Sequence, residues 1–399
     1  MSILVLNAGS STLKFALFAE QTCEELARGL VDWRGTADTA RLTLQSPHGD
    51  FEDGAAEITG YQEAVRRILE TLRASGLNDP VHVVGHRIVH GGDQFQQPTR
   101  LDEQTLRQLE AVSPLAPLHN PVALEAVQAA RSALPEAMHT ASFDTAFFST
   151  LPESASIYPV PWSWRKDYGI RRFGFHGISH AWCAMRAAEL LQQSGQPWFR
   201  LVICHLGNGC SATAVQGGRP VATSMGFTPL EGLMMGTRSG SIDPGILLYL
   251  QQQKGFTGEQ LSDALNHQSG LLGVSGVSSD FRQVEQAADE GSQRARLAIL
   301  MFADRIRSTI ASLVVTMGGF DGLVFTAGIG EHSDRLRRLV ASKLGCLGVQ
   351  LDNDRNRAGQ ADSQISVDGS PVRVLIVRTR EEQMIAREAQ RLLRGAGES

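Results

Sequence analysis

The chain contains one strand–turn–strand pattern twice, half a chain apart. The first copy reads ILVLNAGSSTLKFALF at residues 3–18, and the second reads LVICHLGNGCSATAV at residues 201–215. When the two copies are aligned, Asn7 falls on His205 and Gly9 falls on Gly207, each 198 positions further along a chain of 399 residues. A repeat at about half the chain length predicts an α/β protein with a duplicated fold, whose halves face each other across a cleft.

The turns of these hairpins are rich in small residues, which leave the backbone accessible to a ligand. Glycine has no Cβ, so the backbone N–H groups of Gly207-Asn208-Gly209 can approach an anionic group closely and cradle a phosphate. Taken alone, this short pattern is more often that of an ordinary hairpin. A third strand, at 323–331, runs into a Gly-x-Gly turn at Gly328 and Gly330. Three such turns favour a nucleotide site.

Three charged residues stand in contexts that are unusual for surface charges. Arg87 ends an apolar strand-like run at 81–92, where it is either a buried structural ion pair or an anion ligand. Asp144 lies among apolar residues, as a cap, a turn residue, or a metal or transition-state group. Arg238 lies in a glycine-rich connection at 225–240, and is either a surface charge or part of a site rim.

Composition excludes several classes of function. The net charge is −5 and no run of Lys and Arg stands out, so we expect no nucleic-acid partner. No apolar run approaches the roughly 18 residues of a membrane span, so we expect no membrane partner. The chain starts directly with strand residues, without a leader pattern, and its five cysteines are scattered. We therefore expect a cytoplasmic protein with buried, reduced thiols.

The chain lacks the Walker A sequence and the HRD and DFG sequences of protein kinases. A more specific pattern is present instead. The segments LNAGSSTLK, GHRIVHGG, SFDTAFF, RRFGFHGISH, CHLGNGCS, MGTRSGSIDPG, GLLGVSG with SDFR, and FTAGIGE resemble the signature segments of the acetate kinase family. They follow the order and spacing of that family from residue 3 to about residue 388, which is essentially the whole chain.

The resemblance implies a fold, a reaction and partners. The fold would be the duplicated actin-like (ribonuclease H-like) ATPase fold, with two domains around a central nucleotide cleft. Residues 1–150 would form the domain with acyl-substrate residues, and residues 151–379 the domain with the nucleotide site and the interface of a homodimer. The helix at about 380–399 would pack back on the first domain. The reaction would convert ATP and acetate reversibly into ADP and acetyl phosphate, with Mg²⁺, or Mn²⁺, as the cofactor.

The resemblance also assigns roles to residues. The catalytic residues would be Arg87, Asp144, His176 and Arg238. The acetate pocket would be formed by Arg87, Val89, Leu118, Phe175 and Pro229. The nucleotide would be bound by Ser10, Thr12, Lys14, His205, Leu206, Gly207, Asn208, Gly209, Asp280, Phe281, Arg282, Gly328, Ile329, Gly330, Glu331 and His332. The metal would be bound by Asn7 and Glu381.

The sequence departs from the family pattern at a few positions. Thr12 replaces the usual Ser and keeps its hydroxyl. His332 and Arg380 stand where the family usually has Asn, and Gln383 stands where it has an apolar residue. The change from Asn to His332 bears on nucleotide preference. Arg380 and Gln383 bear on the surroundings of Glu381.

Three other functions compete with that of an acetate kinase. A kinase for propionate or butyrate would differ in pocket size, where the bulk of Val89 favours the shortest acid. A nucleotide-gated binding protein of the same superfamily would hydrolyse ATP without any acid and would need no pair of carboxylate-clamping arginines. A sugar kinase would need a catalytic base for its hydroxyl substrate, whereas acetate, with a pKa of roughly 4, is already ionised at pH 7.

Overall fold

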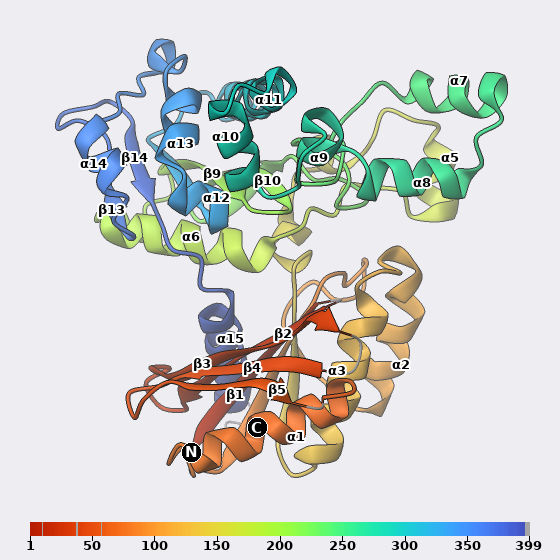
Figure 1. Cartoon of the computed structure of the whole chain (residues 1–399), viewed down its shortest axis with the longest axis vertical. Coiled ribbons are helices and arrows are strands. Elements are labelled where there is room, and N and C mark those ends of the chain that lie inside the picture. Colours follow the sequence, from red (N-terminus) through yellow and green to blue (C-terminus); the bar gives the residue numbers. More distant parts are fainter. Residues whose placement is uncertain (10, 37–38, 57, 396–399) are drawn as a thin grey trace. The chain divides into compact units, whose positions relative to one another are not determined.

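The structure is a computed structural model that describes residues 1–9, 11–36, 39–56 and 58–395. The chain divides into two compact units (Figure 1). The first unit comprises Met1–Ser149 together with Arg380–Ser399, and the second comprises Thr150–Thr379. Each unit contains one mixed β-sheet with helices packed against it.

The sheet of the first unit has the strand order β5-β4-β3-β2-β1-β6-β8-β7. Its strands are β1 Ser2–Gly9, β2 Thr12–Ala19, β3 Glu25–Thr36, β4 Thr39–Gln45, β5 Phe51–Ala56, β6 Val81–Ile88, β7 Thr99–Arg100 and β8 Met138–Phe143. Strand β1 is antiparallel to β2 and parallel to β6, and β6 is parallel to β8. The carboxyl ends of β1, β6 and β8 therefore share one edge of this sheet.

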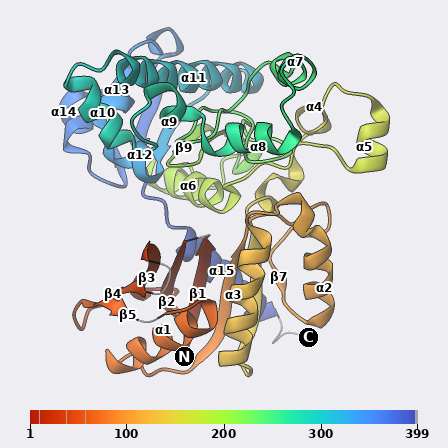
Figure 2. The same cartoon turned by 45° about the vertical axis from the view of Figure 1, so that its right-hand side comes forward.

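Helices cover both faces of the first sheet. They are α1 Tyr61–Ala74, α2 Glu103–Val112, α3 Asn120–Ala133 and α15 Glu381–Gly395, with a 3-10 turn, η1, at Ser113–Leu115. Leu4 and Leu6 of β1 belong to the core shared with α1 and α3, whereas α15 packs against β1, β6 and β8 (Figure 2). A Cβ on Gly85 would lie 2.7 Å from Ile385 Cγ2, so the close approach of α15 to β6 requires glycine.

The sheet of the second unit repeats this topology. Its order is β11-β10-β9-β12-β14-β13, with β9 antiparallel to β10 and parallel to β12, and β12 parallel to β14. The strands are β9 Arg200–Leu206, β10 Cys210–Gln216, β11 Arg219–Thr223, β12 Gly322–Thr326, β13 Ser363–Gln364 and β14 Arg373–Ile376. Strands β9 and β10 start at Arg200 and Cys210, each 198 positions after the starts of β1 and β2. The predicted duplication is therefore confirmed.

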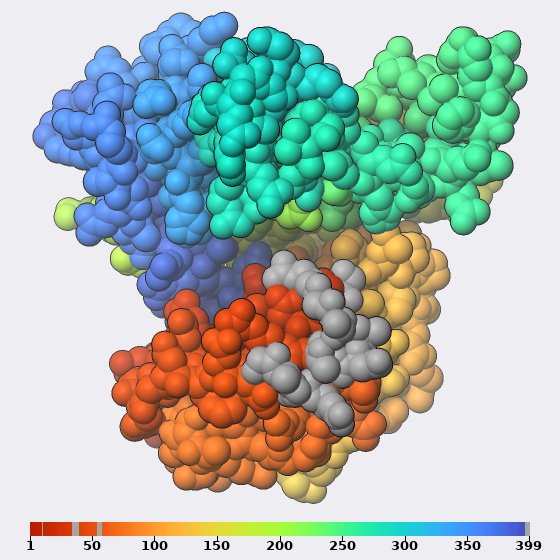
Figure 3. Space-filling view, in the orientation of Figure 1, coloured from red at the N-terminus to blue at the C-terminus, as the bar shows by residue number. Residues whose placement is uncertain are grey.

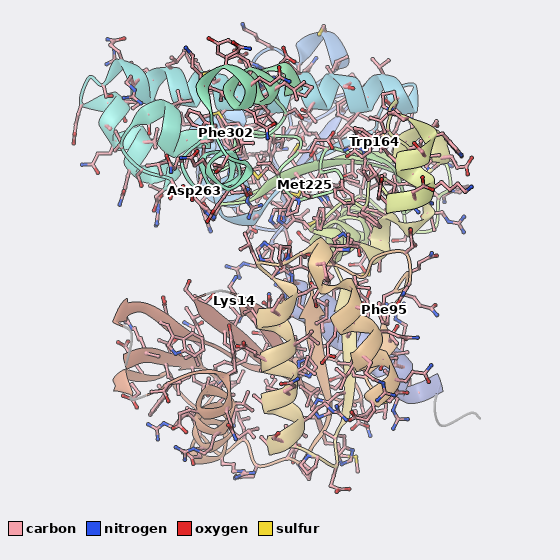
Figure 4. All side chains as sticks on the ribbon, turned by 90° about the vertical axis from the view of Figure 1, so that its right-hand side faces the viewer. Lys14, Phe95, Trp164, Met225, Asp263 and Phe302 are labelled. Carbon is pink, nitrogen blue, oxygen red and sulfur yellow. The ribbon has the colours of Figure 1, made fainter. Side chains whose placement is uncertain are left out.

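The first three helices of the second unit precede β9 in the chain, and the others lie between β11 and β14. They are α4 Glu153–Ser156, α5 Trp162–Tyr168, α6 Gly177–Leu190, α7 Pro244–Lys254, α8 Gly258–His267, α9 Gly270–Ser275, α10 Phe281–Asp289, α11 Gln293–Met317, α12 Ala327–His332, α13 Asp334–Ala341 and α14 Asn353–Ala358. The short 3-10 turns are η2 Ala146–Thr150, which spans the boundary between the units, and η3 Gly345–Leu347. Phe302 of α11 is fully buried in the core of this unit (Figure 4).

The Gly-x-Gly segment after β12 differs from the prediction. The sequence predicts a turn at Gly328–Gly330, but these residues form the first turn of α12, which begins at Ala327 directly after the strand. Ala327 has a positive φ of 64°, and its N–H donates a 3.0 Å hydrogen bond to Glu331 Oε1. This side-chain bond satisfies a helix N-terminal donor and lets the helix start without a connecting loop.

Two further predictions concern membranes and thiols. Across the ranges that the structure describes, none of the helices has the length and hydropathy needed to cross a bilayer. The five cysteines are free thiols, of which Cys346 is exposed and the other four are buried. The reduced state of the thiols stays a prediction, and Cys346 differs from the buried position expected for it.

Candidate active site

Arg87 and Asp144 form the centre of a charged cluster in the first unit. Arg87 lies at the end of β6, and Asp144 directly follows β8, the parallel neighbour of that strand. Arg87 Nε donates to Asp144 Oδ1 over 3.2 Å, and Arg87 Nη2 donates to Asp144 Oδ2 over 2.6 Å. This bidentate geometry is the strong form of an arginine–carboxylate pair. Of the two interpretations left open for Arg87, the ion pair is therefore present.

Asn7 joins this cluster to the start of α15. Its Oδ1 accepts a 3.2 Å hydrogen bond from Arg87 Nη1. Its Nδ2 donates to Glu381 Oε2 over 3.3 Å and to Glu382 Oε1 over 3.1 Å. Asn7 and Glu381 were predicted from the sequence, but Glu382 was not, because its only signal is that it is a second acidic residue in the first turn of the helix.

The charges in this cluster do not balance. Burial lowers the pKa of Arg87, but Asp144, Glu381 and Glu382 together outweigh burial and raise the pKa of Arg87. Within the set of Arg87, Asn7, Asp144, Glu381 and Glu382, one cation faces three carboxylates, so these five residues together carry an excess of negative charge. Oxygen donors and excess negative charge suit Mg²⁺, which typically binds one or two carboxylates and completes its shell with waters and phosphates. Asn7, Glu381 and Glu382 fit that pattern.

The described residues do not form a metal site that is built from several acidic, His or Cys side chains. No group of three or more His, Cys, Asp or Glu side chains among them is arranged to hold a metal ion. A cation at Asn7 and Glu381 would therefore take further ligands from outside the protein, as Mg²⁺ does with a nucleotide.

The first hairpin places its predicted residues beside this cluster. Lys14 of β2 pairs with Asn7 in the strand register, and its side chain is exposed (Figure 4). Thr12 pairs with Gly9, whose carbonyl accepts a 2.7 Å hydrogen bond from the Tyr61 hydroxyl. Ser10 lies outside the described residues.

The second hairpin presents its turn to a glycine-rich loop of the same unit. Asn208 is exposed at the tip of the turn, and its carbonyl accepts a 3.0 Å hydrogen bond from Gly236 N–H. A Cβ on Gly236 would lie 2.2 Å from Asn208 Oδ1, so only glycine allows this approach. His205 and Leu206 are buried in β9. Their side chains are therefore not exposed at the turn.

His176 and Arg238 approach the same point of this turn. A Cβ on Gly209 would lie 3.2 Å from His176 Nε2 and 3.7 Å from Arg238 Nη1. His176 has a positive φ of 58° at the start of α6, a strained conformation that often marks functional positions. Burial lowers the pKa of Arg238, whose Nη1 donates to the Pro229 carbonyl over 3.1 Å. The second unit therefore directs an imidazole nitrogen and a guanidinium nitrogen at the glycine turn.

A cavity of about 520 Å³ adjoins this turn in the second unit. Its size is in the range of small-molecule and cofactor sites, about 300–1,000 Å³. It is lined by Gly207, Asn208, Ser279, Asp280, Phe281, Arg282, Glu285, Gly328, Ile329, His332 and Ser333. Ser279, Glu285 and Ser333 were not anticipated. Glu285 stands one helical turn after Phe281, and burial raises the pKa of this carboxyl group.

Several residues assigned to the nucleotide do not line this cavity. They are His205, Leu206, Gly209, Gly330 and Glu331. Glu331 is buried and turned inward, where its Oε1 accepts hydrogen bonds from Ala327 N–H and Thr379 N–H over 3.0 and 2.9 Å. At the rim, Asp280 caps α10 and pairs with the exposed Arg282.

The four apolar residues assigned to the acetate pocket are divided between the units. Val89 and Leu118 belong to the first unit, and Phe175 and Pro229 to the second. Leu118 is exposed, Val89 and Pro229 are partly exposed, and Phe175 is buried. Pro229 accepts the hydrogen bond from Arg238 described above, which links it to the donors at the glycine turn.

Comparison with known proteins identifies the family. The model of the Acetokinase family matches residues 2–387. The chain is 43% identical to the acetate kinase of Thermoanaerobacter pseudethanolicus, over 99% of this chain and 100% of that protein. It is 46% identical to the propionate kinase of Citrobacter rodentium, over 98% of this chain and 96% of that protein.

Solved structures agree with this match. A crystal structure of acetate kinase from Porphyromonas gingivalis superposes with a TM-score of 0.89 at 38% identity, covering 98% of this chain and 99% of that chain. A propionate kinase from Francisella tularensis gives 0.90 at 36% identity, with the same coverage. The chain has the two-domain actin-like ATPase fold and belongs to the acetokinase family.

Proposed function

We propose that this protein is an acetate kinase that transfers the γ-phosphoryl group of ATP to acetate, giving acetyl phosphate and ADP in a reversible reaction. The observation that carries the proposal is the convergence of His176 Nε2 and Arg238 Nη1 at Gly209. This point follows Gly207 and Asn208, which line the nucleoside-sized cavity. A nucleotide in that cavity would direct its phosphates toward the two donors.

Each group has a defined role in the proposed phosphoryl transfer. Acetate is already ionised at neutral pH and needs no general base. One of its oxygens attacks the γ-phosphorus, the bond from that phosphorus to the β-bridging oxygen breaks, and the bonding electrons leave with ADP. Charge on the transferring group is stabilised by Arg238 and by the N–H of His176, since phosphoryl transfer depends chiefly on positioning and electrostatic stabilisation.

Arg87 is proposed to hold the carboxylate. A guanidinium group has five N–H donors. Asp144 uses two of them and Asn7 uses a third, which leaves two for a substrate carboxylate. Asp144 is proposed to fix the orientation of Arg87. The apolar side chains of Val89, Leu118, Phe175 and Pro229 are proposed to enclose the methyl group.

The remaining site residues complete the nucleotide and metal sites in this proposal. Thr12, Lys14 and the turn at Gly207–Gly209 would bind phosphates. Residues 279–282, Glu285, Gly328, Ile329, His332 and Ser333 would surround the nucleoside. Mg²⁺, or Mn²⁺ in its place, would be held at Asn7, Glu381 and Glu382, and would neutralise phosphate charge when bound.

The same site supports propionate as a second substrate. Curated relatives at 43–46% identity include both acetate kinases and propionate kinases. Val89 is larger than Ala or Gly, and its bulk favours acetate over the longer acid. One methylene changes substrate preference by only about 1–3 kcal/mol, so we expect some activity with propionate.

The proposal is tested by measuring ADP release and acyl phosphate together. Acyl phosphate is trapped as the hydroxamate in reactions with ATP, Mg²⁺ and acetate, propionate, butyrate or no acid. Acid-dependent turnover with the highest kcat/KM for acetate supports the assignment. A higher kcat/KM for propionate replaces acetate with propionate as the substrate. ADP release that is independent of acid overturns the kinase and supports a nucleotide-gated binding protein.

We also propose that the protein is a cytoplasmic homodimer. None of the residues of α5 or α7 is buried, and both helices expose large apolar side chains (Figure 4). These are Trp162, Trp164, Tyr168, Ile246, Leu248 and Tyr249. Helices α7 and α8 form a lobe at the side of the second unit (Figure 3). Apolar patches of this kind typically mark protein interfaces, and free thiols are typical of a reducing compartment.

The dimer is tested by sedimentation. Wild-type protein should sediment as a dimer, and Leu248→Glu should shift it toward the monomer. A monomeric wild type would contradict this part of the proposal.

A further inference from the structure

A buried hydrogen-bonded chain lies behind His176 in the second unit. Ser211 Oγ lies 3.0 Å from His176 Nδ1 and 2.7 Å from His180 Nε2. His180 and Ser211 are fully buried, whereas His176 is partly exposed. One serine hydroxyl therefore connects a buried histidine to the histidine that approaches Gly209.

Local structure holds this chain in place. His176 and His180 are four residues apart at the start of α6, and the His180 N–H donates a 2.9 Å hydrogen bond to the His176 carbonyl. Both rings reach the same Ser211 hydroxyl, so they lie on one side of the start of α6. Ser211 comes from β10, directly after the glycine turn and Cys210. The ring of His205 stacks on His176 with centroids 4.1 Å apart, and His205 Nδ1 bonds to Ser179 Oγ over 2.8 Å.

The chemistry of the hydroxyl makes the two histidines interdependent. A serine hydroxyl has one proton and two lone pairs, and a neutral imidazole has one donor nitrogen and one acceptor nitrogen. Ser211 can donate to only one of the two rings, so the other ring must donate to it. The tautomer of one histidine therefore fixes that of the other.

We propose that His180 and Ser211 are positioning residues that hold His176 in the tautomer with its proton on Nε2. In this arrangement His180 Nε2–H donates to Ser211 Oγ, and Ser211 O–H donates to His176 Nδ1. His176 Nε2–H then points toward Gly209 and Arg238 as a hydrogen-bond donor. The opposite direction would leave a lone pair on Nε2, which would repel an anionic phosphoryl group. This inference rests on the proposed function, because a site for an anionic phosphoryl group requires a hydrogen-bond donor at His176 Nε2.

Burial agrees with a neutral chain. Desolvation, followed by the nearby His205, lowers the pKa of His180 well below its ordinary value. A neutral His180 carries one ring proton, which it can donate from Nε2 to Ser211 Oγ as the proposed arrangement requires. The positive charge at the turn is then carried by Arg238, whose Nη1 approaches the same point as His176 Nε2.

The direct test is the ¹⁵N NMR spectrum of the histidine rings in the full-length protein without ligands. His176 is assigned by comparison with His176→Gln, and is expected to show a protonated Nε2 and an unprotonated Nδ1. Ser211→Ala should mix or invert the two tautomers, and Ser211→Thr should restore the wild-type signals. A wild-type His176 protonated on Nδ1, or a tautomer unaffected by Ser211→Ala, would overturn the inference.

Kinetics provide the second measurement. Ser211→Ala should lower kcat by about 10- to 100-fold with little change in either KM, which is less than the about 10²–10³-fold cost of losing a donor outright. His180→Gln keeps an N–H near Nε2 and should retain most of the activity, whereas His180→Phe keeps only the bulk and should resemble Ser211→Ala. Equal activities for these two His180 variants, at equal thermal stability, would overturn the relay.

The two readouts separate this inference from the proposed function. If wild-type protein showed no acid-dependent turnover, the kinase proposal would fail while the tautomer of His176 could still be read from the spectrum. If turnover were normal and the tautomer were independent of Ser211, only the relay would fail.

Discussion

Arg87 and Asp144 are 57 residues apart in sequence and form a two-point ion pair, with N–O distances of 3.2 and 2.6 Å. Asp144 is almost completely buried, and Arg87 is 19% exposed in its side chain. The pair fixes the plane of the guanidinium, and with the further bond to Asn7 two of its five donors remain uncommitted. Arg87 is thus held in one orientation before any substrate binds, which reduces the entropy lost on binding.

The first prediction concerns the shape of Arg87. Arg87→Lys keeps the positive charge but loses the planar fork that can bind two carboxylates at once. We expect KM for acetate to rise by about 10- to 100-fold, equivalent to about 1.4–2.8 kcal/mol, with little change in KM for ATP. Initial-rate kinetics with each substrate varied in turn measure this effect.

A matched control lies on the surface of the same unit. Arg131 pairs with the exposed Glu103, so Arg131→Lys should leave both KM values unchanged. An unchanged KM for acetate in Arg87→Lys would remove Arg87 from the carboxylate site.

The second prediction concerns Arg238. Arg238→Ala removes the cation at the glycine turn, and an arginine that stabilises a phosphoryl transition state contributes about 10³–10⁵ in kcat. We expect a loss of that order, with a smaller loss for Arg238→Lys. Arg338→Ala, at an exposed arginine of the same unit, is the control and should have wild-type kcat. Near-normal turnover of Arg238→Ala would refute its assigned role.

The third prediction separates two roles for Glu331. The family resemblance assigns it to the nucleotide, whereas its Oε1 accepts hydrogen bonds from Ala327 N–H and Thr379 N–H. Glu331→Ala leaves both donors unpaired, which costs about 1–3 kcal/mol for each buried group. Glu331→Gln keeps an acceptor oxygen and should stay close to wild type in both melting temperature and KM for ATP. A normal melting temperature with a raised KM in Glu331→Gln would instead support nucleotide contact.

The fourth prediction is a pH dependence of stability. Burial raises the pKa of Glu388, on the face of α15 that packs against β8, and Ser142 opposes this shift only in part. None of the described residues donates a hydrogen bond to Glu388 Oε2. The folded protein therefore binds this proton more tightly than the unfolded chain does. The contribution of Glu388 to stability is fully present below its ordinary pKa of 4.5 and is lost as pH rises through the folded pKa.

Glu388→Gln removes this dependence. We expect the variant to melt a few degrees above wild type at pH 8, with the difference shrinking toward pH 4.5, in calorimetric scans. Glu70→Gln on the exposed face of α1 should show no such trend. A variant that melts below wild type at every pH would show that Glu388 is stabilising in its ionised form.

The duplicated fold could be predicted from sequence because its signals are local. Strand patterns and small-residue turns repeat 198 positions apart, and β1 and β9 start at Ser2 and Arg200. The Arg87–Asp144 contact could not be predicted in the same way, although both residues were singled out. Their pairing depends on the parallel register of β6 and β8, which joins segments 57 residues apart.

The direction in which a side chain points was a second feature that could not be predicted from the sequence. The segment at Gly328–Gly330 predicts a turn with Glu331 near a ligand, but the positive φ of Ala327 starts a helix that turns Glu331 inward. Ser211 had no signal of its own, because a small residue in a buried strand is unremarkable. Only its position opposite His176 and His180 gives it a role.

The central claim is that a carboxylate oxygen attacks the γ-phosphorus of ATP. It is tested most directly by ³¹P NMR of the products formed from ATP, Mg²⁺ and acetate labelled with ¹⁸O in both oxygens. We predict an acyl phosphate whose phosphorus signal shows the isotope shift of one bridging ¹⁸O, together with an equal amount of ADP. Inorganic phosphate and ADP without acyl phosphate, or at a rate independent of acetate, would contradict the account.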